Sequence, residues 1–98
     1  MKYDHDILRD ALSGLFDIQA EPEKVIVTAP GPLCNEFYRY MGEQHPESRK
    51  MMFRPTMELG QEIHFNHSST DQVVQWVHCF AEELEPSVVS ACYRAIYP

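Results

Sequence analysis

One cysteine of the chain stands where thiol chemistry would be favoured. Cys34 follows the break at Pro30–Pro32 and falls just inside a predicted helix. The dipole and the free amides at a helix N-terminus lower the pKa of a thiol and favour the thiolate, which is the nucleophilic form. Arg39 lies at a Cys-x4-Arg spacing, one residue short of a phosphate-binding Cys-x5-Arg loop, and no glycine lies between the two. A free cysteine is also commonly packed as a small hydrophobe.

The basic residues of the chain gather in its middle. Segment 24–54 is the only part with a net positive charge, and its cations include Arg39, Arg49, Lys50 and Arg54. An anion would find partners there, although scattered charges are also the ordinary surface of a soluble domain. The alternative function that these residues support is a small thiol or anion-processing enzyme centred on Cys34.

Histidines and a further cysteine invite a zinc hypothesis. His64 and His67 form a His-x-x-His pair, and His78 and Cys79 follow on a predicted helix. Zinc uses such ligands. However, residues three apart on a strand point to opposite faces, and neighbours on a helix point about 100° apart. We therefore predict no metal site and no cofactor, and keep a histidine that titrates near neutral pH as a looser alternative.

Aromatic and acidic side chains gather in the last third of the chain. Tyrosine and tryptophan are common anchors of protein interfaces. Trp76 neighbours Gln72 and Gln75, and it is either a surface aromatic or a cover over the edge of the core. Glu82, Glu83 and Glu85 would otherwise be a solvated helix end. The candidate partner-binding residues are Trp76, Glu82, Glu83, Glu85, Tyr93 and Tyr97.

The overall charge bears on the class of partner. The 98-residue chain has a formal net charge of −7, which disfavours nucleic acid and anionic membranes as partners and favours a basic protein. No apolar run reaches the length of a membrane span, no signal peptide opens the chain, and three widely spaced cysteines indicate reduced thiols, so we expect a cytoplasmic location. We expect a small protein-binding regulator or inhibitor rather than an enzyme. By analogy with inhibitors carried by phages and other mobile elements, its target would be a nucleic-acid-binding complex.

Seven elements must position these side chains. A helix stripe runs from Ile7 to Phe16, and a second helix runs from Leu33 to Met41. Strands are predicted at 25–27, 51–53 and 57–65, with a turn at Pro55–Thr56 and with Gln61 as the one polar residue on the apolar face of the last strand. Ser69 and Gln72 have capping-box spacing at the start of the third helix, and Pro86 opens the fourth.

The fold class follows from this order of elements. We predict a single α+β domain over residues 1–98, with a small three-stranded mixed or antiparallel sheet covered by about four helices, in the order α-β-α-β-β-α-α. The first two strands would be joined by a right-handed crossover if they are parallel. A homodimer that buries further surface would be compatible with a chain of this size.

Overall fold

The computed structural model describes residues 5–55 and 61–98. Within these ranges the chain forms four α-helices, one short 3-10 helix and four strands, as an α+β fold. In chain order the elements are α1 (His5–Ser13), β1 (Asp17–Ala20), β2 (Lys24–Ala29), α2 (Gly31–Gln44), η1 (Pro46–Lys50), β3 (Met52–Phe53), β4 (Gln61–Asn66), α3 (Thr70–Glu83) and α4 (Pro86–Ile96). The predicted α+β class and the four helices are confirmed.

The sheet has four strands, so the predicted number of three is wrong. The strand order is β1-β2-β4-β3, and all three pairings are antiparallel. Of the two predicted kinds of sheet, mixed and antiparallel, the antiparallel one is therefore the correct one. The first two expected strands, β2 and β3, run parallel to each other, because each is antiparallel to β4 between them, so the connection through α2 is a crossover that skips one strand.

The additional strand, β1, follows the predicted first helix directly and occupies residues that were assigned to no element. That helix stops at Ser13, where Gly14 weakens the last turn. Asp17–Ala20 then pairs with Val25–Thr28, and the Glu21 N–H donates to the Lys24 carbonyl at 2.9 Å to close a tight hairpin. β1 forms because β2 supplies a partner, since its own residues have little strand preference.

The predicted strand 57–65 is found from Gln61 onward. The part of that prediction that concerns Met57, Glu58 and Leu59, and the Thr56 half of the predicted turn, lie outside the described residues. Ile63 and Phe65 are buried, and Gln61 shares their face because it pairs with Ala29. The Gln61 Oε1 atom is buried without a hydrogen-bond partner among the described residues, so this position is a polar defect in an apolar face.

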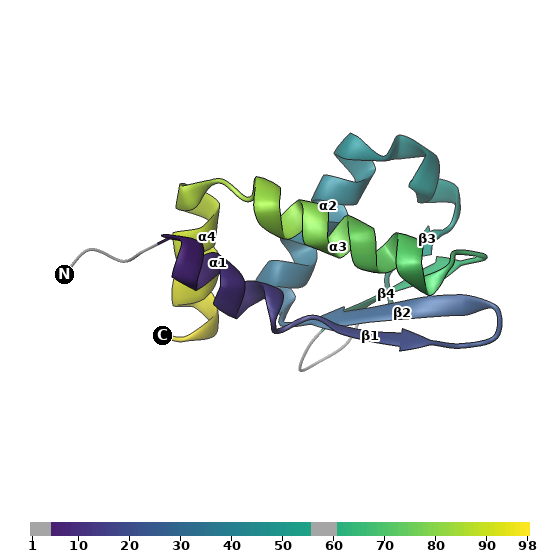
Figure 1. Ribbon diagram of the computed structural model, residues 1–98, viewed down its shortest axis with the longest axis horizontal. Helices are drawn as coiled ribbons and strands as arrows, with labels where there is room; N and C mark the ends of the chain where they lie inside the picture. Colours follow the sequence, from purple (N-terminus) through teal and green to yellow (C-terminus); the bar gives the residue numbers. More distant parts are fainter. Residues whose placement is uncertain (1–4, 56–60) are drawn as a thin grey trace.

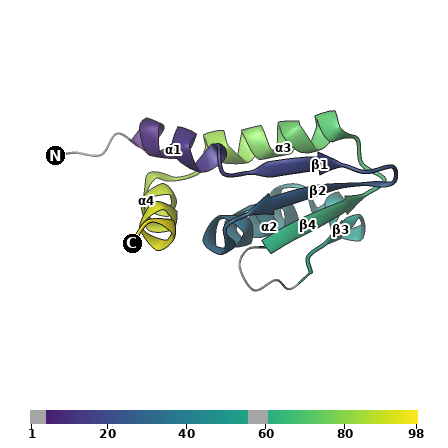
Figure 2. The same cartoon turned by 90° about the horizontal axis from the view of Figure 1, so that it is seen from below.

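The helices lie on one side of the sheet and at one end of it. Figure 1 shows α2 and α3 above the strands, with α1 and α4 side by side beyond the strand ends, and Figure 2 shows the same arrangement from below. The core side chains come from α1, α2, α3, α4, β2 and β4, and Phe37 at the centre of α2 is fully buried. Its ring meets Phe16 at 5.4 Å and Phe80 at 5.2 Å between centroids.

The third helix begins where its sequence predicts. The Ser69 hydroxyl accepts a hydrogen bond from the Gln72 N–H at 3.2 Å, which satisfies one of the free amides of the first turn. At the other end of α3, Arg9 of α1 donates from Nη2 to the Leu84 carbonyl at 2.6 Å. None of the helices in the described ranges combines the length and the apolarity that crossing a bilayer requires.

Candidate functional site

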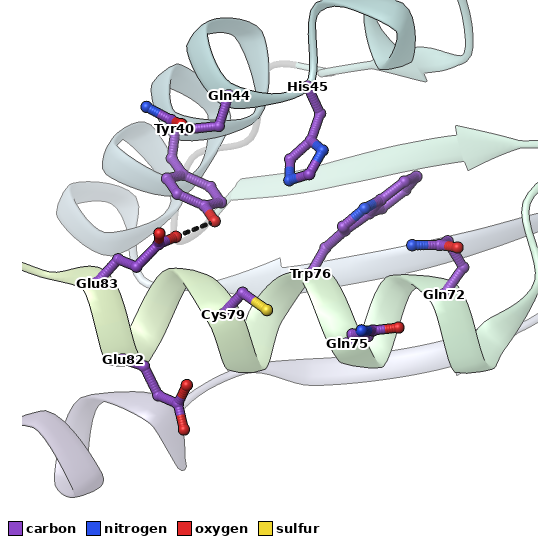
Figure 3. A pocket seen from close by; sticks show the side chains of 9 residues that line it. All are labelled: Tyr40, Gln44, His45, Gln72, Gln75, Trp76, Cys79, Glu82 and Glu83. Carbon is purple, nitrogen blue, oxygen red and sulfur yellow. Dashed lines mark hydrogen bonds between the residues drawn. The ribbon is translucent and has the colours of Figure 1, made fainter.

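A groove runs along the seam between α2 and α3. Its main hollow has a volume of about 400 Å³ and is open to solvent. Figure 3 shows the side chains around it, with Tyr40, Gln44 and His45 on one side and the residues of α3 on the other. The lining residues are Tyr40, Gln44, His45, Gln72, Gln75, Trp76, Cys79, Glu82 and Glu83. We call this the main hollow.

A smaller hollow continues the groove towards α4. It has a volume of about 170 Å³, and it shares Tyr40 and Glu83 with the main hollow. Its lining consists of the charged residues Glu36, Arg39, Glu43, Glu83 and Glu85 and the less polar residues Tyr40, Phe80, Leu84 and Val88. We call this the small hollow. The groove is therefore one continuous surface in two parts.

Helical spacing explains why α2 presents these side chains together. Glu36, Tyr40 and Glu43 are at positions i, i+4 and i+7, which lie on one stripe of a helix. On α3, Gln72, Cys79 and Glu83 fall on the flank that faces this stripe, beside the buried face of Val73, Val77 and Phe80.

A hydrogen bond joins the two helices between the hollows. The Tyr40 hydroxyl donates to the Glu83 carboxylate, as the dashed line in Figure 3 shows. Burial raises the pKa of the Tyr40 phenol above its ordinary value, and the hydrogen bond and the charge of Glu83 raise it further. The phenol therefore stays protonated and serves as a donor that holds one glutamate in place.

Trp76 forms part of the floor of the main hollow. Its exposed fraction is 8%, which places it at the edge of the core and not on the open surface. The indole centroid lies 5.6 Å from that of Phe65 and 5.7 Å from that of His45. Of the two sequence-based interpretations, the cover over the core edge is the one that the structure supports. Trp76 shapes the hollow and keeps little surface for a partner.

Carboxylates dominate the charge of the groove. Glu36, Glu43, Glu82, Glu83 and Glu85 line the two hollows, and among the described residues Arg39 is the one lysine or arginine beside them. Arg39 is already paired with Glu36, at 2.5 Å between Nη2 and Oε2. Charges held close together beside low-dielectric walls reinforce one another's potential. The groove is therefore an anionic surface with an apolar floor.

The predicted partner-binding set divides in space. Trp76, Glu82, Glu83 and Glu85 all line the groove. Tyr93 and Tyr97 do not: their rings contact each other at a tilt, with centroids 5.0 Å apart, beside Leu8 and Arg94 in a separate hollow between α4 and α1.

The alternative anion site is not assembled around Cys34. That residue is 1% exposed, and burial raises the pKa of its thiol to about 11, with Arg54 opposing the rise. Of the two interpretations of Cys34 drawn from the sequence, the packed small hydrophobe agrees with this burial, and the lowered pKa does not, because burial outweighs the helix N-terminus. Arg39 is exposed and lies five residues along α2, on a different side of the helix.

The other basic residues of that set lie along the flank of α2 that faces away from the groove, or at the end of η1. Arg54 donates to the Asn35 side-chain carbonyl and lies 5.5 Å from the Tyr38 ring centroid. The Arg49 guanidinium lies over Gly42, where a Cβ atom would come within 3.4 Å of it. Lys50 is exposed at the end of η1. Of these three cations, Arg54 is the one that acts on the Cys34 thiol, so the set as a whole does not converge on it.

The residues considered for zinc are dispersed. Both ring nitrogens of His64 are hydrogen-bonded: Nε2 lies 2.8 Å from Glu62 Oε1, and Nδ1 lies 3.3 Å from Lys24 Nζ. His78 is exposed and lies 3.0 Å from Glu82, and His67 is exposed in a left-handed conformation with φ of 59°. Across residues 5–55 and 61–98, no three histidine, cysteine or acidic side chains gather as a metal ion would require.

Sequence reasoning missed the α2 side of the groove. Glu36, Tyr40, Glu43 and His45 were not among the predicted site residues, although the first three have the spacing of a single helical stripe. An acidic stripe with a central tyrosine can be recognised from the sequence. Its position opposite the carboxylates of α3 cannot, because it depends on how two helices far apart in the sequence pack.

Comparison with protein-family models, with curated proteins and with solved structures finds no match. The geometry and the charge of the groove are therefore the guide to its function.

Proposed function

We propose that this protein is a binding module that takes a basic segment of another protein into the groove between α2 and α3, and so acts as a regulator or inhibitor of that partner. The observation that carries the proposal is the excess of carboxylates along the groove: five glutamates line it, against one arginine that is already paired. Complementary charge across an interface increases the association rate and discriminates against wrong partners.

The lining of the main hollow also supports a protein partner over an apolar small molecule. Ligand pockets are mostly apolar with a few polar groups, whereas the amides of Gln44, Gln72 and Gln75 stand around this open hollow. Glutamine amides both donate and accept, so they can hydrogen-bond a peptide backbone. A basic segment could place its cations at the carboxylates and its backbone over the amides.

In a more specific form of this proposal, the partner is a protein that normally binds nucleic acid. Proteins that bind nucleic acid carry lysine and arginine where phosphates lie. A row of carboxylates could occupy those positions in place of phosphates. The net charge of −7 supports this version, because it repels nucleic acid and attracts the basic surface.

Two double variants with the same change in net charge test the groove. Glu43→Lys with Glu82→Lys reverses charge at both hollows, whereas Asp10→Lys with Asp17→Lys reverses two exposed carboxylates that line neither hollow. The probe is a blocked pentapeptide of alternating arginine and alanine, and calorimetry at about 50 and 300 mM NaCl gives its affinity. We expect the groove variant to bind at least tenfold more weakly at low salt, and the control to lose less than threefold.

The same measurements can also contradict the proposal. If both double variants lose affinity equally, the attraction comes from net charge and not from the groove. If the affinity of the unaltered protein does not change with salt, the electrostatic basis of the proposal is wrong, because exposed charges are screened within about 10 Å at 0.1 M ionic strength.

A further inference from the structure

The small hollow combines an apolar wall with unneutralised carboxylates. Phe80 and Leu84 contribute apolar surface from α3 and its C-terminus, and Val88 contributes it from α4. Glu43 stands on α2, and Glu85 stands at the N-cap of α4. A long cationic side chain buries its methylenes on apolar surface and keeps its charged end near solvent. An apolar wall with carboxylates at its rim therefore suits such a side chain.

The volume of the small hollow limits what it can hold. Sites for small-molecule ligands commonly span about 300–1,000 Å³. At about 170 Å³ the small hollow is below that range, and it is suited to a single side chain. The main hollow, at about 400 Å³, is left for the rest of a bound segment.

Two of the four glutamates around the small hollow have no side-chain partner among the described residues. Glu36 is held by Arg39, and Glu83 accepts the hydrogen bond from Tyr40. Among the described residues, Glu43 and Glu85 form neither an ion pair nor a side-chain hydrogen bond. Glu85 is an N-cap residue, yet its carboxylate does not turn to accept from the helix amides. Both carboxylates are therefore available to a cation that enters from outside.

We propose that the small hollow is an anchor site for one arginine or lysine side chain of the partner, with its methylenes on Phe80, Leu84 and Val88 and its charged end between Glu43 and Glu85. This inference rests on the proposed function and specifies which part of the basic segment is bound most tightly. Interfaces concentrate their binding energy in a few such anchored side chains.

Filling the small hollow without changing charge tests the anchor. Val88→Phe places a ring in the hollow, and the matched control Val74→Phe enlarges an exposed side chain on α3 that lines neither hollow. Calorimetry uses the same arginine–alanine pentapeptide and three counterparts that carry lysine, citrulline or norleucine. We expect Val88→Phe to weaken the arginine peptide at least tenfold, Val74→Phe to change it less than twofold, and the citrulline and norleucine peptides to bind at least tenfold more weakly.

A second variant keeps the test valid if Val88→Phe does not fold, which thermal unfolding would reveal. Glu43→Gln with Glu85→Gln removes the two free carboxylates and is expected to reduce the preference for arginine over citrulline at least fivefold. If Val88→Phe folds and binds the arginine peptide normally, while Glu43→Lys with Glu82→Lys abolishes binding, the anchor is refuted and the groove remains the binding site. If citrulline binds as well as arginine, the charge of the anchor is refuted.

Discussion

The reactivity of the three thiols separates the binding module from the alternative enzyme. Cys34 and Cys92 are buried, whereas Cys79 is half-buried at the main hollow. Replacing Cys79 with serine leaves only the two buried thiols. We expect this variant to react with Ellman's reagent at pH 8 at least 100-fold more slowly than the unaltered protein, which should show one fast thiol.

The size of this effect follows from burial and charge. Burial raises the pKa of the Cys34 thiol from 9.0 to about 11, which lowers its thiolate fraction at pH 8 about 100-fold relative to an ordinary cysteine. Burial also raises the pKa of Cys92, with the charge of Glu36 adding to the rise. Restricted access slows both buried thiols further, which opposes the greater intrinsic nucleophilicity of a more basic thiolate.

One result would refute this reasoning. If Cys79→Ser still contains a fast thiol, and peptide mass spectrometry maps the label to Cys34, then the start of α2 activates the thiol after all. The enzyme hypothesis would then regain its nucleophile. Denaturing the labelled protein in guanidinium provides the control, because all remaining thiols should then react at the same rate.

Three further predictions concern the stability of the fold. Phe37→Ala should lower the free energy of unfolding by about 3–5 kcal/mol, because the ring is fully buried among Phe16 and Phe80, and an unchanged urea midpoint would contradict this packing. Ser69→Ala should lower the free energy of unfolding by about 1 kcal/mol by removing the cap of α3, whereas Ser69→Asp should retain most of the stability because its carboxylate can accept the same hydrogen bond. Equal losses in thermal unfolding would contradict the capping role of this position. Between pH 9 and 11 the unfolded chain releases the Cys34 proton that the folded protein keeps, so this thiol alone should lower stability with rising pH by at most ~2.7 kcal/mol. The raised pKa values of Cys92 and Tyr40 act in the same direction. Cys34→Ala should make the dependence shallower, and a dependence that stays equally steep would contradict this.

Local signals were sufficient for the starts of the last two helices. Ser69 with Gln72, and Pro86 after Glu85, mark the starts of α3 and α4 because capping and proline placement are decided within a few residues. The sheet depended on more distant partners. Ile18 is the one β-branched residue of β1, and nothing nearby indicates that Val27 lies opposite it.

The same division applies to the groove. The carboxylates at the end of α3 were identified because they cluster in sequence, as Glu82, Glu83 and Glu85 do. Tyr40 was missed as a site residue because its importance comes from Glu83, which is 43 positions away. Trp76 was ambiguous from its neighbours, since only the positions of Phe65 and His45 decide that it is covered.

The central place of β4 has a consequence for how the protein folds. Lys24 of β2 and His64 of β4 are 40 residues apart in the chain, so the sheet cannot be completed until a long loop has closed. The β1–β2 hairpin that precedes it is only marginally stable alone, as isolated hairpins are. On the ribosome, the N-terminal half would therefore remain without a sheet until β4 has emerged. We expect nascent chains that end before Gln61 to be degraded readily by proteases, and chains that extend beyond α3 to become resistant.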